Sequence, residues 1–172
     1  MTGTDKEESV MNWEGRIESV HFATEVGAPM TTPESIHAIA GEGVAGDRYS
    51  RGEGTFSYTG GARRQITLFE TEVLETIARD HNVHLAPHEC RMNLITRDVP
   101  LTHLVFRTFR VGNVLLHGLK LNEPCARRNE VTGKRVIKAL IHRCGLFCEI
   151  LEGGEIRPGA IVAPADRMAK SA

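Results

Sequence analysis

Cys125 is the residue whose type and setting best support chemistry. It lies in the segment 122–129, NEPCARRN, directly after Pro124 and shortly before Arg127 and Arg128. Proline cannot donate to the hydrogen-bond ladder of a sheet, so Pro124 is expected to end a strand and to place the thiol at a strand end or in a loop. Nearby guanidinium charge favours the thiolate, which is the form that attacks electrophiles and binds metals. The alternative is a small packed core residue, since free cysteine is among the most buried residue types.

Two further sets of residues could bind an anion. Arg91 and Asn93 lie in the segment 90–94, CRMNL, and both can donate hydrogen bonds to a phosphate or to the edge of a heterocycle. Each arginine could instead be solvated or ion-paired, but arginines from distant parts of the chain could also converge on one anion. The second set consists of Asp47-Arg48 and Arg63-Arg64.

Two further cysteines, Cys144 and Cys148, are close enough in the sequence to suggest a metal site. Structural zinc usually needs four ligands, often in two close pairs. Cys144 and Cys148 lie in a segment that we interpret as a strand. Four strand residues span about 13 Å, which is too far for one ion. Core packing is therefore the better interpretation of this pair, and no metalloprotease, serine-triad or phosphate-loop pattern is present.

The composition excludes several classes of partner. The chain has 172 residues and a formal net charge of -1, which favours one domain and gives no global attraction to nucleic acid or to an anionic membrane. No apolar run approaches the roughly 18 residues of a membrane span, and the acidic start is unlike a signal peptide, so we expect a cytoplasmic protein. The segment 127–143 is locally basic, with six Lys or Arg residues against Glu130, and this favours a small anionic ligand.

Short alternating apolar runs predict a strand-rich domain, and two segments have helical spacing instead. The helices are expected over 70–81 and 132–142, and a two-residue hairpin turn is expected at Gly112-Asn113, with a second reversal at Gly153-Gly154. Because strands dominate and do not alternate with helices, we predict a mainly β fold, barrel-like or a sandwich, with a few peripheral helices. The strands are expected at 17–22, 35–39, 65–69, 106–111, 114–119, 146–151 and 160–162.

The chain divides into one domain with two flexible ends. Residues 1–12 and 164–172 are polar or small and lack a periodic apolar face, so the predicted domain spans 13–163. Within it, the glycine-rich stretch 41–64 is the least regular part. A loop of this length inside a compact domain is usually functional or mobile.

Taken in order, these segments resemble the MOSC domain, which is named after the C-terminal domain of molybdenum cofactor sulfurases. The resemblance covers nearly the whole chain, about residues 15–163. The matching stretches are GVAGDR at 43–48, RQITL at 64–68, RMNL at 91–94, VGNVL at 111–115, EPC at 123–125, and HRCG at 142–145 leading to GEIRPG at 154–159.

The resemblance implies a β-barrel-like fold around a cleft for a molybdenum cofactor, a phosphorylated pterin. Cys125 matches the family's characteristic cysteine, which ligates molybdenum in reductase members and carries sulfur in the sulfurase proposal. A soft thiolate suits molybdenum, and the pterin needs hydrogen-bond donors. Those donors would be Arg48, Arg64, Arg91, Asn93 and Arg143.

Three hypotheses about the role of the chain and of Cys125 remain open. The first is a reductase of N-hydroxylated compounds, such as hydroxylamino-purines or amidoximes, which needs an external electron-transfer protein because the chain has no iron–sulfur cysteine run. The second is a non-catalytic cofactor carrier or sulfur-transfer module, with a persulfide on Cys125 supplied by a sulfur-donor protein, since the pyridoxal-phosphate domain of full sulfurases is missing. The third is a folded domain in which Cys125 is only packed.

Overall fold

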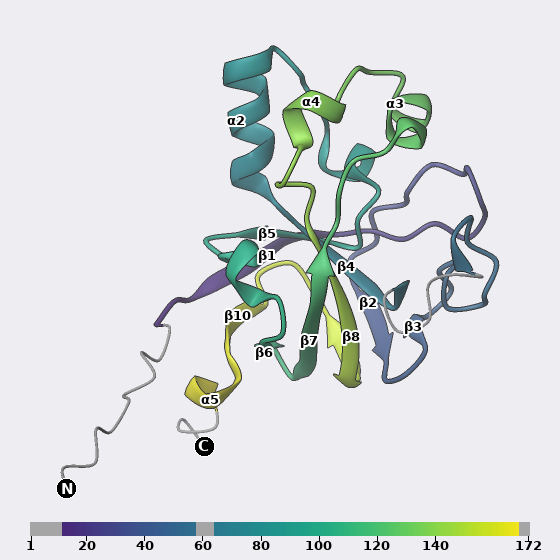
Figure 1. Cartoon of the computed structure of the whole chain (residues 1–172). Helices are drawn as coiled ribbons and strands as arrows, with labels where there is room; N and C mark the ends of the chain where they lie inside the picture. Colours follow the sequence, from purple (N-terminus) through teal and green to yellow (C-terminus); the bar gives the residue numbers. More distant parts are fainter. Residues whose placement is uncertain (1–11, 58–63, 169–172) are drawn as a thin grey trace, which may run out of the picture.

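The core of the protein is a closed β-barrel. The structure, a computed structural model, describes residues 12–57 and 64–168. The barrel strands pair in the order β1-β10-β6-β7-β8-β4-β5, and β5 closes the ring by pairing with β1 (Figure 1). This confirms the predicted mainly β, barrel-like fold. The bounds are β1 Gly15–Val20, β4 Ile66–Glu70, β5 Leu94–Arg97, β6 Thr108–Val111, β7 Val114–Leu121, β8 Leu146–Glu152 and β10 Ile161–Pro164.

A small second sheet lies beside the barrel. It consists of β3 (Gly43–Val44), β2 (Ile36–Ile39) and β9 (Gly154–Ile156), in that order. The hairpin predicted at Gly112-Asn113 is confirmed, because Val111 pairs with Val114 across it. The reversal predicted at 153–154 is wrong in its partner: β9 leaves β8 and pairs with β2 in the second sheet.

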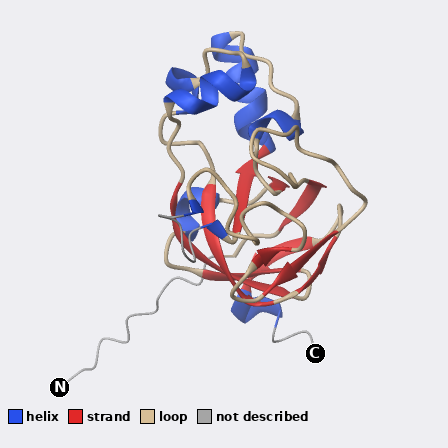
Figure 2. Ribbon diagram, turned by 90° about the vertical axis from the view of Figure 1, so that its right-hand side faces the viewer, coloured by secondary structure: helices blue, strands red, loops and turns tan. Residues whose placement is uncertain are grey.

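Three helices cover one end of the barrel, and we call them the cap (Figures 1 and 2). They are α2 (Thr71–His81), α3 (Ala126–Thr132) and α4 (Ile137–Leu140). Helix α2 matches the predicted helix, and its apolar face buries Val73 and Ile77. The 3-10 helix η2 (Pro87–Cys90) lies between α2 and β5 in the chain, and η3 (Leu101–Leu104) follows β5.

The single helix predicted over 132–142 is wrong. Gly133 adopts a left-handed backbone with φ of 64°, which ends α3, and the chain re-enters a helix only at Ile137. The Asn129 side chain accepts a hydrogen bond from the Val136 backbone N–H at 2.9 Å and so stabilises the break. The apolar spacing was real, because Val136 and Leu140 are buried, but a glycine set the helix boundary.

Two apolar clusters hold these parts together. One fills the barrel and includes Phe109 and Leu116, and the other lies between barrel and cap and includes Ile77. Cys148 belongs to the barrel cluster and Cys144 to the cap cluster. Core packing, as predicted for this pair, is therefore confirmed, and the described residues contain no group of three or more His, Cys, Asp or Glu side chains that could hold a metal ion.

The ends of the domain differ slightly from the expected boundaries. Pro164 is the last residue of β10, and Ala165–Met168 form the short helix α5, so regular secondary structure continues past residue 163. The other end predicted as flexible, residues 1–12, lies outside the described residues except for Asn12. Within 12–57 and 64–168, no helix has the length and apolar character needed to cross a membrane.

Candidate functional site

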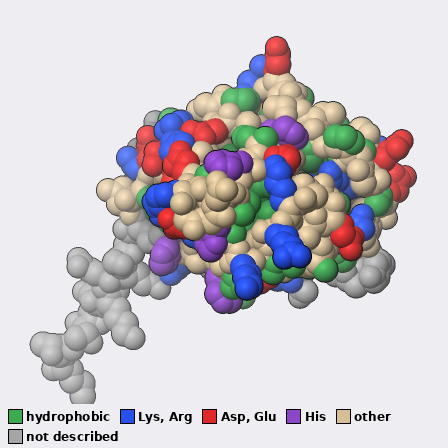
Figure 3. Space-filling model, turned by 90° about the horizontal axis from the view of Figure 1, so that it is seen from above, with side chains coloured by type: hydrophobic (Ala, Val, Ile, Leu, Met, Phe, Trp, Pro, Cys, Tyr) green, Lys and Arg blue, Asp and Glu red, His purple; other side chains and the backbone are tan. Residues whose placement is uncertain are grey.

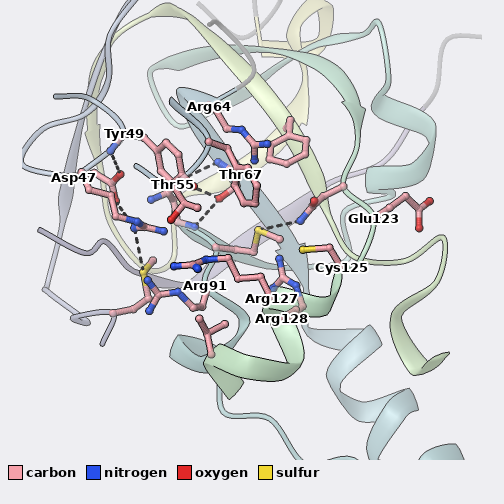
Figure 4. A pocket seen from close by; sticks show the side chains of 18 of the residues that line it. Asp47, Tyr49, Thr55, Arg64, Thr67, Arg91, Glu123, Cys125, Arg127 and Arg128 are labelled. Carbon is pink, nitrogen blue, oxygen red and sulfur yellow. Dashed lines mark hydrogen bonds and ion pairs between the residues drawn. The ribbon is translucent and has the colours of Figure 1, made fainter. Parts of the chain in front are cut away.

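A cavity of about 340 Å³ lies where the barrel, the cap and the loop after β3 meet. The lining comes from the loop between β1 and β2, the loop after β3, the start of β4, the residues just before β5, the end of β7 with the loop that follows it, helix α3 and the start of β8 (Figure 4). Its volume is in the range of small-molecule sites, about 300–1,000 Å³. The polar lining residues are Asp47, Arg48, Tyr49, Thr55, Arg64, Thr67, Arg91, Asn93, Lys120, Asn122, Glu123, Cys125, Arg127 and Arg128.

Cys125 differs from the other three cysteines. It is exposed, lines the cavity and directly precedes α3, whereas the others are buried. Burial raises the pKa of the Cys90 thiol to about 12 and that of the Cys144 thiol to about 11, and it raises the pKa of Cys148 as well. The buried thiols therefore stay protonated at neutral pH, and Cys125 is the cysteine available for ligation or attack.

Four guanidinium groups gather around the cap side of the cavity, and we call them the arginine cluster. They belong to Arg48, Arg91, Arg127 and Arg128. Burial lowers the pKa of Arg91, and repulsion from the other three arginines lowers it further. Like charges this close are costly unless an anion joins them, so the cluster is suited to a phosphate.

Hydrogen bonds hold the arginine cluster in position. Arg48 is buried and forms an ion pair with Asp47 at 3.5 Å, and the other Asp47 oxygen accepts the Tyr49 backbone N–H at 2.8 Å. Arg91 donates to the Ala28 carbonyl at 2.6 Å. Arg128 donates to the Cys90 carbonyl. Three of the four cations are thus fixed by the protein before any ligand binds.

A second cationic group, which we call the Phe147 pair, consists of Arg64 and Lys120. The Arg64 guanidinium carbon lies 4.6 Å from the centroid of the Phe147 ring, and the Lys120 ammonium nitrogen lies 5.6 Å from the same centroid. Arg64 also stacks near Tyr49 at 5.8 Å and Phe56 at 4.9 Å. Its buried Nε has no hydrogen-bond partner in the described part of the chain. The aromatic rings therefore fix a guanidinium whose hydrogen-bonding capacity is not used up.

Asn93 lines the cavity as predicted, but its side-chain amide forms hydrogen bonds mainly with other parts of the fold. Its Oδ1 accepts the backbone N–H and the hydroxyl of Thr67, each at 3.1 Å, and its Nδ2 donates to the His21 carbonyl at 3.1 Å. These bonds join the starts of β4 and β5 to the end of β1. Asn93 therefore shapes the floor of the cavity.

Arg143 is not brought to the cavity. Its Nε donates to the Ala139 carbonyl at 2.6 Å, and its Nη2 lies 3.3 Å from the ring of His81, the last residue of α2. Figure 3, seen from above, shows Lys, Arg and His side chains scattered over this side of the molecule. The basic segment 127–143 thus divides: two of its cations enter the cavity, and Lys134 forms an ion pair with Glu89 at 3.0 Å. Arg48, Arg64, Arg91, Asn93 and Cys125, by contrast, share one cavity.

The lining is strongly cationic. It carries six Lys or Arg side chains against two carboxylates, a net formal charge of +4 on a chain of net charge -1. Asp47 is taken by Arg48, and Glu123 accepts from the His142 backbone N–H at 2.9 Å and from its ring at 3.0 Å. The arrangement can hold more than one negative charge beside a thiol.

Sequence reasoning missed several lining residues. Lys120 and Phe147 sit in strands β7 and β8, which pair through those two residues, and no local pattern distinguishes them. Tyr49 lies in the irregular stretch 41–64, whose length was its only signal. Arg63 lies outside the described residues.

The fold and the cavity define a class: a small closed barrel with a helical cap and a thiol-bearing, cationic pocket. Comparison with known proteins makes the class specific. The sequence matches the MOSC domain over residues 55–163, which is more than half of the chain, so the protein belongs to the MOSC domain family. This is a family associated with the molybdenum cofactor. No curated protein matches the chain in sequence.

Solved structures agree with the fold. The YuaD protein of Bacillus subtilis is 18% identical with a TM-score of 0.73, over 88% of this chain and 97% of that one. YiiM of Geobacillus stearothermophilus is 14% identical with a TM-score of 0.63, over 89% and 76%. YiiM of Escherichia coli is 16% identical with a TM-score of 0.62, over 87% and 69%. At these identities the likeness establishes the fold alone.

Proposed function

We propose that the cavity binds molybdenum cofactor with Cys125 as the molybdenum ligand, and that the protein reduces N-hydroxylated compounds using electrons from an external electron-transfer protein. The observation that carries this proposal is the exposure of Cys125 inside a cationic cavity, while the other three cysteines are buried. The absence of a membrane-crossing helix in the described residues is compatible with a cytoplasmic place for this activity.

The residues present fit such a cofactor. A phosphorylated pterin is anionic, and the arginine cluster offers it four guanidinium groups, three of which are already held in place by hydrogen bonds. Guanidinium groups bind phosphate through charge-assisted hydrogen bonds, which are about twice as strong as neutral ones. Soft thiolate is the ligand type that suits the metal.

The chain's own residues would act by binding and orientation. When bound, the molybdenum supplies the two-electron step that cleaves an N–O bond, a reduction that consumes two electrons and two protons and releases water. Cys125 would hold the metal at the cavity, beside the guanidinium groups of Arg127 and Arg128. The arginine cluster would hold the phosphate, and Asp47 would keep Arg48 oriented toward it.

A second candidate is supported by the same exposure. A cysteine that is accessible from solvent could carry a persulfide, received from a sulfur-donor protein, and pass it to an acceptor. In this role the protein would be a carrier or sulfur-transfer module and would turn over no substrate. The two functions differ in whether molybdenum stays bound.

The test is metal analysis of protein expressed in a host that makes the cofactor. Wild type should contain near-stoichiometric molybdenum and Cys125→Ala almost none, while the cofactor-free forms of the two proteins should have the same thermal unfolding midpoint. Arg135→Met removes an exposed cation from the same basic segment but outside the cavity, so it should keep its molybdenum. If neither wild type nor control holds molybdenum although a known molybdenum protein is loaded, the reductase proposal fails. Mass spectrometry of Cys125 for a persulfide would then test the carrier.

A further inference from the structure

The cations of the cavity form two separate groups. Figure 4 shows Arg64 at one end of the cavity and Arg91, Arg127 and Arg128 at the other, with Thr67 between them. Lys120 belongs to the Arg64 end, because both side chains flank the Phe147 ring. With Thr67 between the two groups, the cavity offers a second cationic position beside the arginine cluster.

We propose that the cavity has two anion subsites, and that the Phe147 pair binds the anionic group of the substrate. Resting on the proposed function, this makes the substrate class phosphorylated N-hydroxylated compounds, such as an N-hydroxylated nucleoside monophosphate, in place of the free base. The arginine cluster then remains for the phosphate of the cofactor.

The charge balance of the cavity supports a second anion. Both lining carboxylates are engaged at other positions: Asp47 with Arg48 and with backbone N–H groups, and Glu123 with His142. Among the described residues, none forms an ion pair with Arg64 or Lys120. The pair therefore presents two uncompensated positive charges. A phosphate monoester carries a charge of about −1.5 to −2 at neutral pH, which matches them.

The aromatic surroundings make the Phe147 pair a binding site for an anion. Three rings, those of Tyr49, Phe56 and Phe147, lie within cation–π distance of the Arg64 guanidinium. Stacking fixes the plane of the guanidinium, so little conformational entropy is lost when it binds an anion. Lys120 is exposed and can follow the ligand.

Calorimetry with adenosine monophosphate and adenosine as probes tests the subsite without any turnover. A nucleotide-binding subsite predicts that adenosine monophosphate binds about tenfold tighter than adenosine or better, the value of one or two charge-assisted hydrogen bonds. Lys120→Met should remove most of that difference and leave the molybdenum content unchanged. Arg135→Met should keep the difference, and because Lys120 is exposed, its substitution should leave the fold intact.

The possible outcomes separate this proposal from the proposed function. Equal affinity for the two probes, or a preference that survives in Lys120→Met, overturns the subsite. Binding of adenosine monophosphate by cofactor-free protein but not by loaded protein also overturns it, because the cofactor then occupies the Phe147 pair. Lys120-dependent binding by a protein that never takes up molybdenum supports the second subsite and refutes the molybdenum function. Lys120-dependent binding by loaded protein supports both.

Discussion

The barrel interior is apolar and fully packed, whereas the cavity rim, by which we mean the arginine cluster and the Phe147 pair, is cationic. In the barrel, side chains such as Phe109, Leu116 and Ile150 are almost fully buried among apolar neighbours, and their contacts stabilise the fold directly. At the rim, Arg91 is repelled by three other arginines, and of the arginine cluster only Arg48 forms an ion pair within the described residues, with Asp47. The two regions therefore have different roles: the barrel contributes most to the free energy of unfolding, and the rim provides charged groups that a ligand can satisfy.

Thiol labelling gives the largest expected contrast between the two regions. Cys125 should react rapidly with a chromogenic disulfide reagent in native protein, and one thiol per chain should be modified in the fast phase. Cys90, Cys144 and Cys148 should react only through unfolding, slower by a factor on the order of a thousand or more, as expected for a domain stable by about 5 kcal/mol or more. Two fast thiols per chain would show that the regions are not separated in this way.

The buried thiols also predict a dependence of stability on pH. Burial raises the folded-state pKa of Cys90 to about 12 and that of Cys144 to about 11. The folded state therefore keeps protons that the unfolded chain releases in alkali, and this contribution to stability is complete below the ordinary thiol pKa. The urea midpoint of unfolding should accordingly fall as the pH rises above that range, and a midpoint that stays constant would contradict this prediction.

A substitution in the barrel should cost stability and spare anion affinity. Phe109 is fully buried, and Phe109→Ala should lower the free energy of unfolding by about 3–5 kcal/mol, because it removes a large apolar side chain and leaves a cavity. Urea denaturation measures the loss. The folded fraction should still bind inorganic phosphate with wild-type affinity, and a loss of affinity in that fraction would mean that the barrel and the rim are coupled.

A substitution beside the rim, Gly54→Ala, should have the smallest effect, and it should lower anion affinity rather than stability. A Cβ added at Gly54 would lie 2.1 Å from a carbon of the Tyr49 ring, so in Gly54→Ala the ring must move. Arg48 stacks on that ring at 4.7 Å and Arg64 at 5.8 Å, and both guanidinium groups should lose their position. Phosphate affinity, measured by calorimetry, should fall about three- to tenfold, corresponding to the loss of roughly 1 kcal/mol of stacking.

Gly52→Ala is not a suitable control for this change, because Gly52 has a φ of 72°, a backbone conformation in which an alanine would be strained. Thr55→Ala is better, since Thr55 neighbours Gly54 and lines the cavity without stacking on Tyr49. An unchanged phosphate affinity in Gly54→Ala would contradict the positioning role of Tyr49.

Sequence reasoning found what local patterns encode. Alternation located the strands, and the 3.6-residue spacing located α2 because Val73 and Ile77 face one core. Cys125 was found because Pro124 and two arginines flank it within four positions. The helix predicted over 132–142 was wrong because the apolar spacing gives no sign that the helical backbone is interrupted at Gly133.

The remaining site residues depend on tertiary pairing. Lys120 and Phe147 are opposite each other only because β7 and β8 pair with one register irregularity between Gly118 and Lys120. Arg143 was expected beside the other arginines because the stretch 142–145 resembles the family, but its side chain contacts Ala139 and His81 instead. Charge in a sequence segment predicts a cationic surface, and the fold decides which charges share a ligand.

The pairing pattern of the barrel also bears on the order of folding. Strands β4 and β5 are parallel neighbours joined through α2, and the Thr67–Asn93 contact at the cavity floor closes a loop of only 26 residues. Closure of the barrel instead requires β1 to pair with β10, which joins Gly15 to Val162. During synthesis the floor can form on a nascent chain, whereas the barrel can close only after residue 162 has left the ribosome. Chain termination upstream of β10 would leave β1 and β6 with open edges, a known route to aggregation.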